Sequence, residues 1–302
     1  MDDLTRRDIE KISYNILKDS KSFDTFPTPV DQILHYSDFA LDKSIDLRNV
    51  DQSFFGKLKE KSQKSLLTAI SKVMGIFDRH EKTIYIDSNI NKNLGRKNFV
   101  KLHEIGHGIL PWQNDIMLAL DDDETLNEEI EKQFEAEANY FASITLFQHD
   151  RFVAEIEKAS LGLGTVMQLS KKFGSSVHST LRNYVLKSGN KCVLLVLNNI
   201  SKSEKNNIYT NKLSKRDIFY SSRFLKELGT LNLPEEFGFK WNFIQDFMFD
   251  KRYNENGEID LITAEGEEIE CEYHFFNSTY NSFVLIFPKG EKNKAKIKYI
   301  LS

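Results

Sequence analysis

Residues 99–110 read FVKLHEIGHGIL, and this stretch decides how the rest of the chain is interpreted. Its two histidines, His103 and His107, are four residues apart, so a helix would stack both imidazoles on one face. Apolar residues at helical spacing, among them Leu102 and Ile109, form a stripe that would seat such a helix against a core. The pattern predicts a helix over residues 96–110, ended by Pro111.

Two imidazoles one helical turn apart are a typical pair of metal ligands. Glu104, directly after the first histidine, would lie beside the metal, where it can take a proton from a metal-bound water. We expect one zinc ion per chain, because zinc lowers the pKa of its bound water to about 7. Gly106 lies in the same turn, although glycine costs a helix roughly 1 kcal/mol relative to alanine. We expect this glycine to permit the close approach of another backbone or of a substrate.

A catalytic zinc site needs a third protein ligand, and a second helix is expected to supply it. Residues 126–147, which follow an acidic run at 121–124, have a core-facing apolar stripe. Glu135 and Asn139 lie on the adjoining face, one turn apart. Glu135 is therefore the expected ligand, and Asn139 is a neighbour able to hold the ligands by hydrogen bonds. Glu137 lies about 200° round the helix from Glu135 and is the weaker candidate.

Four more side chains are candidates for polarising the carbonyl group of a substrate at this site. They are Tyr140, which follows Asn139 and is the second candidate neighbour of the metal ligands, and Tyr85, His149 and His178. For each of them, packing in the core or at the surface is the alternative role.

These segments resemble one known family, the ImmA/IrrE-type metallopeptidases, a gluzincin-like family of bacteria and phages. The resemblance rests on the strand at 83–86, the lead-in at 96–102, the motif at 103–107 and the helix segment at 135–142. It covers about residues 5–190. In this family a proline signature often follows the second helix, whereas residues 144–148 here read ITLFQ.

The resemblance implies zinc ligation by His103, His107 and Glu135, with Glu104 as general base. It also implies a substrate, because known members cleave helix-turn-helix repressors and so switch on stress or mobile-element genes. We therefore expect a zinc metalloendopeptidase that cuts one regulatory protein, a helix-turn-helix repressor encoded nearby, and so derepresses stress, mobile-element or defence genes.

Two other classes of function compete with this one. A non-catalytic metal-containing sensor or transcription regulator would keep the metal for structure, but it would not need Glu104. A nuclease would need clustered carboxylates for paired divalent ions, and the acidic run at 121–124 is the one candidate.

The predicted fold class is α+β, in three parts. Residues 1–150 form a mostly helical, zincin-like metallopeptidase domain with a small sheet, whose strands are expected at 75–78 and 83–87. Residues 151–190 form a helical, helix-turn-helix-like extension, broken near Gly162 and Gly164. Residues 191–302 form a C-terminal α+β regulatory or sensor domain, with strands at 192–197, 258–263, 268–275 and 282–287 in an antiparallel meander.

The C-terminal part is rich in aromatic residues, which favours a packed core. By analogy of domain order, it is also a candidate GAF-like fold and a candidate site for a small-molecule or protein activator. In the extension, basic residues that could face a DNA groove are few, so we expect packing helices and no DNA binding.

The bulk composition fits this reading. The 302 residues carry a net charge of -4, which gives no chain-wide basic field for nucleic acid or an anionic membrane. The two cysteines, Cys192 and Cys271, are too few for a disulfide framework and fit a reducing compartment. No apolar run approaches the roughly 18 residues of a membrane span, and the N-terminus lacks the apolar core of a signal peptide. We expect a cytoplasmic protein.

Overall fold

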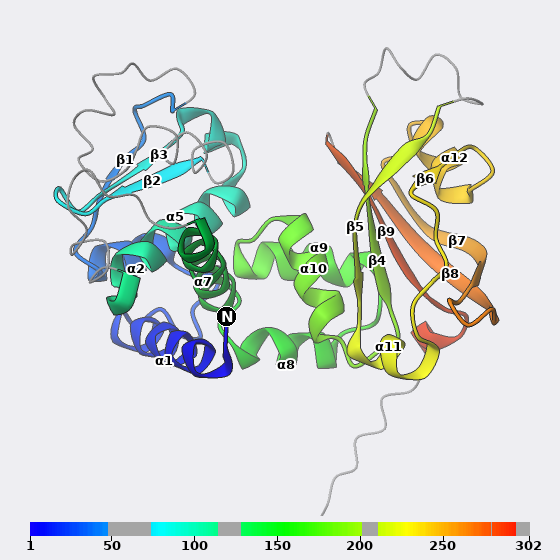
Figure 1. The fold of residues 1–302 in the computed structure, drawn as a ribbon, viewed down its shortest axis with the longest axis horizontal. Coiled ribbons are helices and arrows are strands. Elements are labelled where there is room, and N and C mark those ends of the chain that lie inside the picture. The colour runs from blue at the N-terminus through cyan, green and yellow to red at the C-terminus, as the bar shows by residue number, and fades with distance from the viewer. Residues whose placement is uncertain (48–73, 114–127, 201–210, 279, 294–302) are drawn as a thin grey trace, which may run out of the picture. The chain divides into compact units, whose positions relative to one another are not determined.

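The structure is a computed structural model that describes residues 1–47, 74–113, 128–200, 211–278 and 280–293 (Figure 1). The acidic run at 121–124 lies outside the described residues. The chain divides into two units: unit 1 comprises Met1–Phe152 and Ser170–Ser176, and unit 2 comprises Val153–Leu169 and Val177–Ser302. Helices and sheets occur in both units, which confirms the α+β class.

Unit 1 contains a small three-stranded sheet in the order β1-β3-β2 (Figure 1). Its strands are β1 (Ala40–Asp42), β2 (Gly75–Asp78) and β3 (Thr83–Ile86). β3 pairs antiparallel with β2 and parallel with β1. Ile84 and Ile86 alternate with half-buried residues along β3 and are fully buried in the core. The two expected strands are confirmed, whereas β1 is an addition.

Helices pack against this sheet and against one another. They are α1 (Asp3–Asp19), α2 (Val30–Tyr36), the 3-10 helix η1 (Ser88–Lys92), α5 (Leu94–Ile109) and α7 (Glu128–Leu146). Asn93 caps the N-terminus of α5: its side-chain oxygen accepts from the backbone N–H of Arg96 at 3.1 Å. This helix packs on β2, β3 and α7. The expected helix at 96–110 is confirmed, and the one expected at 126–147 is confirmed from residue 128 on, since 126–127 lie outside the described residues.

Gly106 lies where α5 meets α7. A Cβ at this position would lie 3.0 Å from the Phe141 ring and 3.4 Å from Cα of Ala138. Because Phe141 and Ala138 are completely buried, neither has free space to move into. The close approach expected at Gly106 is therefore that of another backbone, the backbone of α7.

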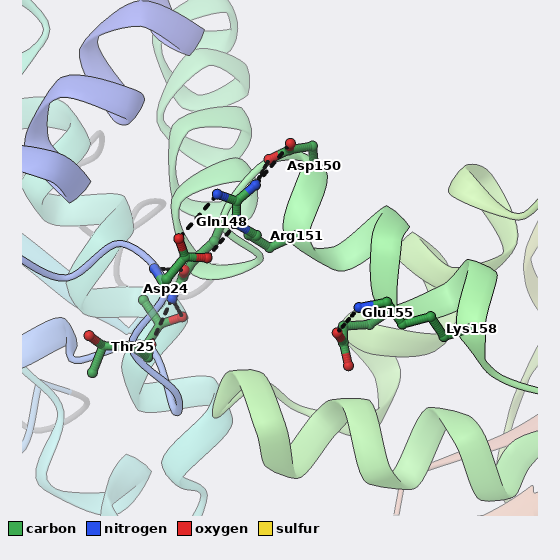
Figure 2. Close-up of polar contacts among 8 residues, drawn as sticks. Asp24, Thr25, Gln148, Asp150, Arg151, Glu155 and Lys158 are labelled. Carbon is green, nitrogen blue, oxygen red and sulfur yellow. Dashed lines mark hydrogen bonds and ion pairs between the residues drawn. The ribbon is translucent and has the colours of Figure 1, made fainter. Parts of the chain in front are cut away.

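A hydrogen-bonded cluster ties the loop between α1 and α2 to the end of α7 (Figure 2). The buried Gln148 accepts from the backbone N–H of Asp24 at 2.8 Å and donates to the carbonyl oxygen of Thr25 at 2.8 Å. Arg151 forms ion pairs with both Asp24 and Asp150. The segment at residues 144–148, which contains no proline, thus ends on a glutamine that holds this loop.

Three helices follow: α8 (Asp150–Lys158), α9 (Leu163–Phe173) and α10 (Val177–Lys187). They confirm the helical segment with a break near Gly162. Gly174 has a φ of +67° in the three-residue turn between α9 and α10, a conformation that favours glycine.

Unit 2 is built on a six-stranded antiparallel sheet in the order β6-β5-β4-β9-β8-β7 (Figure 1). Its strands are β4 (Val193–Asn198), β5 (Leu213–Tyr220), β6 (Glu236–Phe237), β7 (Tyr253–Ile262), β8 (Glu268–Asn277) and β9 (Asn281–Pro288). Two short helices, α11 (Ser222–Leu228) and α12 (Asn242–Met248), accompany it. The four expected strands and the meander β7-β8-β9 are confirmed, and β5 and β6 are additions.

The central strand β4 is buried on both faces over residues 193–197, which explains its unbroken apolar sequence. Cys192 and Cys271 are both buried and unpaired, and burial raises the pKa of each thiol to about 12. Every helix in the described part of the chain is too short or too polar to cross a bilayer.

Candidate metal centre

Three side chains converge between α5 and α7. His103 and His107, one turn apart on α5, bring their Nε2 atoms to 3.0 Å from each other. Glu135 on α7 faces both: its Oε2 lies 3.4 Å from Nε2 of His103, and its Oε1 lies 3.4 Å from Nε2 of His107. Both histidines are buried, and Glu135 is half-buried. The structure thus brings together the three residues expected to bind a metal.

The spacing of these atoms fits a zinc ion. Zinc ligands lie about 2.0–2.2 Å from the metal at tetrahedral angles, which places two ligand atoms roughly 3.3 Å apart. The three separations here are 3.0, 3.4 and 3.4 Å. Two imidazoles and one carboxylate are also the ligand set of a common class of catalytic zinc sites. Among the described residues, this is the one cluster of histidine, cysteine or acidic side chains with such convergence.

The electrostatics of the cluster favour a bound cation. Burial raises the pKa of Glu135, but its hydrogen bonds with His103 and His107 outweigh burial and hold that pKa well below its usual value. Burial also lowers the pKa of His103, but Glu135 and Glu104 outweigh it and raise the pKa above 6.5. Both shifts reflect a concentration of negative charge between α5 and α7, which attracts a cation.

Glu104 is 4% exposed and follows His103 on α5. It is close enough for its charge to raise the pKa of His103, but it is not one of the three converging residues. Gly75 at the start of β2 makes room for it, because a Cβ there would lie 2.7 Å from Oε1 of Glu104. The strand therefore limits where this carboxylate can lie.

A second layer of polar groups supports His107. Its Nδ1 lies 2.8 Å from Oε1 of Gln113, whose Nε2 donates to Oε2 of Glu137 at 2.8 Å. Glu137 also accepts from Nε1 of Trp112 at 2.7 Å and from Nε2 of Gln133 at 2.8 Å. Glu137, the weaker ligand candidate, is thus completely buried behind the cluster. The sequence carried no signal for Gln113, which lies beyond the end of α5.

Asn139 and Tyr140 on α7, the two candidate neighbours of the metal ligands, make different contacts. Asn139 interacts with His103 and contributes to its raised pKa. Tyr140 instead bonds to α1: its hydroxyl accepts from Nε of Arg6 at 2.9 Å and donates to Glu10.

The remaining candidates have other surroundings. His149 lies 3.0 Å from the hydroxyl of Ser13 on α1. Tyr85 lies on β3, where burial raises its pKa. His178 lies in unit 2 and packs on Phe283, with ring centroids 5.0 Å apart. Burial lowers the pKa of His178.

A family of known peptidases matches the part of the chain that contains this cluster. Residues 63–183 match the family model of the M78 peptidases, described as the IrrE N-terminal-like domain. The match contains the whole cluster and confirms the resemblance to the ImmA/IrrE-type family. A transcriptional regulator of Mycobacterium tuberculosis has a similar fold, with a TM-score of 0.52 at 12% identity over 93% of this chain and 76% of that chain. A search of the curated proteins gave no match.

Proposed function

We propose that this chain, whose residues 63–183 match the model of the IrrE N-terminal-like domain, is a zinc metalloendopeptidase that cuts a specific regulatory protein. The convergence of His103, His107 and Glu135 at tetrahedral spacing is the observation that carries the proposal. These three residues are the proposed zinc ligands, and Glu104 is the proposed general base.

The proposed chemistry divides among these residues. Bound zinc would supply a Lewis acid and lower the pKa of a water molecule. Glu104 accepts a proton from that water and later passes it to the leaving nitrogen of the cut peptide bond. Its buried position beside His103, limited by Gly75, supports this role, because a base must be held within reach of the water. Asn139 is the proposed neighbour that steadies His103.

The proposed substrate is a helix-turn-helix repressor encoded nearby, and its cleavage would derepress stress, mobile-element or defence genes. The resemblance to the ImmA/IrrE-type family supports this substrate class. A protease that switches genes must spare other proteins, so little activity is expected on an unstructured protein such as casein.

We propose the same three parts for the whole chain as the sequence suggested. Residues 1–150 form the peptidase domain, 151–190 a helix-turn-helix-like extension that does not bind DNA, and 191–302 a GAF-like sensor domain. The packing of α10 and α12 against an antiparallel sheet supports the sensor assignment. A small molecule or a protein that binds this domain is the proposed activator.

A cleavage assay tests the proposal. The purified chain is incubated with the repressor encoded nearby, with casein as the comparison substrate, and the products are identified by mass spectrometry. We expect one restricted cut in the repressor, loss of cutting after chelation and recovery after zinc is restored. Dependence on millimolar magnesium, or rapid degradation of casein, would contradict the proposal.

A further inference from the structure

We propose that Gln113 and Glu137 are positioning residues that hold His107 in the one tautomer able to bind the metal, an inference that rests on the proposed function. The chain from Glu137 through Gln113 to Nδ1 of His107 is called the relay below. None of its members needs to touch the substrate. Its effect is on how tightly and in what orientation His107 holds the metal.

The orientation of the Gln113 amide follows from its neighbours. Its Nε2 lies 3.2 Å from the carbonyl oxygen of Phe134, which can only accept, and 2.8 Å from Oε2 of Glu137. That end of the amide must therefore be the NH2 group, because an oxygen there would face two acceptors. The other end, 2.8 Å from Nδ1 of His107, must be the oxygen.

The tautomer of His107 follows in turn. Since the Gln113 oxygen can only accept, Nδ1 of His107 must carry the proton. In the neutral ring, Nε2 then keeps its lone pair, and Nε2 is the atom that faces His103 and Glu135. The relay thus selects the tautomer that a metal ligand requires.

Burial makes the relay rigid. Gln113 and Glu137 are both 0% exposed, so water cannot replace their hydrogen bonds. Oε2 of Glu137, the oxygen that accepts from Gln113, also accepts from Nε1 of Trp112, whereas Gln133 donates to the other oxygen, Oε1. A negative charge at the end of the relay also strengthens the Nδ1–H bond and makes Nε2 more basic.

The two histidines differ in this respect. Nδ1 of His103 is buried and has no hydrogen-bond partner within the described part of the chain. His107 is therefore the histidine whose Nδ1 is held by a buried hydrogen bond, and damage to the relay should act on the metal through His107.

Three variants distinguish an effect of the relay on zinc binding from an effect on the stability of the protein. Gln113→Leu removes all three side-chain hydrogen bonds of this residue, to His107, Phe134 and Glu137. Glu137→Gln keeps an acceptor for Trp112 and Gln113 but removes the negative charge. Gln133→Leu is the matched control, because it removes a bond to Glu137 on the side away from His107. Thermal unfolding checks that each variant folds.

Zinc affinity is measured by competition with a chelator. We expect Gln113→Leu to weaken zinc binding about 10- to 100-fold, the usual cost of losing such a partner. Glu137→Gln should weaken it by at least about threefold, and Gln133→Leu by less than about twofold, since only the first two alter the bond to His107. The second readout is the Nδ1–H proton of His107 in the zinc-loaded protein, seen by NMR. It should give a slowly exchanging signal in the wild type that is lost in Gln113→Leu.

The outcomes separate the two proposals. If wild type binds zinc and the folded Gln113→Leu and Glu137→Gln variants bind it equally well, the relay is refuted and the metal site stands. If Gln113→Leu does not fold, Glu137→Gln alone decides, and wild-type affinity in that variant refutes the relay. If wild type binds no zinc, the proposed function fails first.

Discussion

Replacing Gly106 with valine tests the close crossing of α5 and α7 that brings Glu135 to the two histidines. A Cβ at this position already lies 3.0 Å from Phe141 and 3.4 Å from Cα of Ala138, and valine adds two methyl groups. Valine gains only about 0.4 kcal/mol of helix propensity over glycine. Overpacking a filled core costs typically 1–3 kcal/mol. The atoms around Gly106 include the backbone of α7, which cannot move aside as a flexible side chain can. We therefore expect a cost in the upper half of that range and a net loss of about 2 kcal/mol in the free energy of unfolding.

Urea unfolding of the zinc-free protein measures this loss, and chelator competition measures the accompanying fall in zinc affinity. Gly164→Val is the matched control, because the nearest atom to a Cβ there lies 3.7 Å away and its φ is not positive. We expect this control to stay within about 0.5 kcal/mol of wild type. If Gly106→Val unfolds at the same urea concentration as wild type and binds zinc equally well, the close crossing is wrong.

Other perturbations address single parts of the account. Glu135→Gln should weaken zinc binding roughly a hundredfold or more, because about 10–16 kcal/mol of zinc affinity is shared among few ligands; wild-type affinity in the chelator assay would remove Glu135 from the site. Gly75→Ala should lower peptidase activity while zinc content, measured by metal analysis, stays near one per chain, because the added methyl displaces Glu104. The raised pKa of His103 gives the metal-free protein a stabilising contribution that is complete below pH 6.5 and is lost as the pH rises through that pKa. The zinc affinity should instead rise with pH, because a histidine must be deprotonated to bind the metal. A zinc affinity that stays constant between pH 8 and 6 in a chelator titration would contradict this expectation. Burial lowers the pKa of His274 to about 4, so its contribution is complete above pH 6.5 and is lost as the pH falls toward 4, by up to about 3 kcal/mol. Urea unfolding at pH 7 and 4.5 should show this loss, and His274→Asn should reduce it.

The metal cluster could be predicted because its geometry is local. Helical spacing alone places His103 and His107 together, and the stripe on the second helix selects Glu135 over Glu137. The helices themselves follow from apolar periodicity, which reports burial directly. Gly106 could be marked as unusual from its helix cost, although only the structure shows that α7 is what approaches it.

The features that could not be predicted depend on contacts between residues that are far apart in the sequence. Gln113 acts on His107 only because the chain beyond α5 turns back toward α7, and no spacing rule contains that turn. β5 reads LSKRDIFY, too polar to suggest a strand, but it pairs beside the buried β4. His274 had no recognisable partner in sequence, and its ring nitrogen accepts from the backbone N–H of Leu163, 111 residues away.

The central claim is that Glu104 is the base of a zinc peptidase, and the most direct measurement compares wild type with Glu104→Ala. Both proteins are assayed for zinc content and incubated with the repressor encoded nearby. Because Glu104 is not one of the converging ligands, both should hold about one zinc, and only wild type should cut the repressor. Equal cutting by both proteins, or a wild-type protein that holds no zinc, would contradict the account.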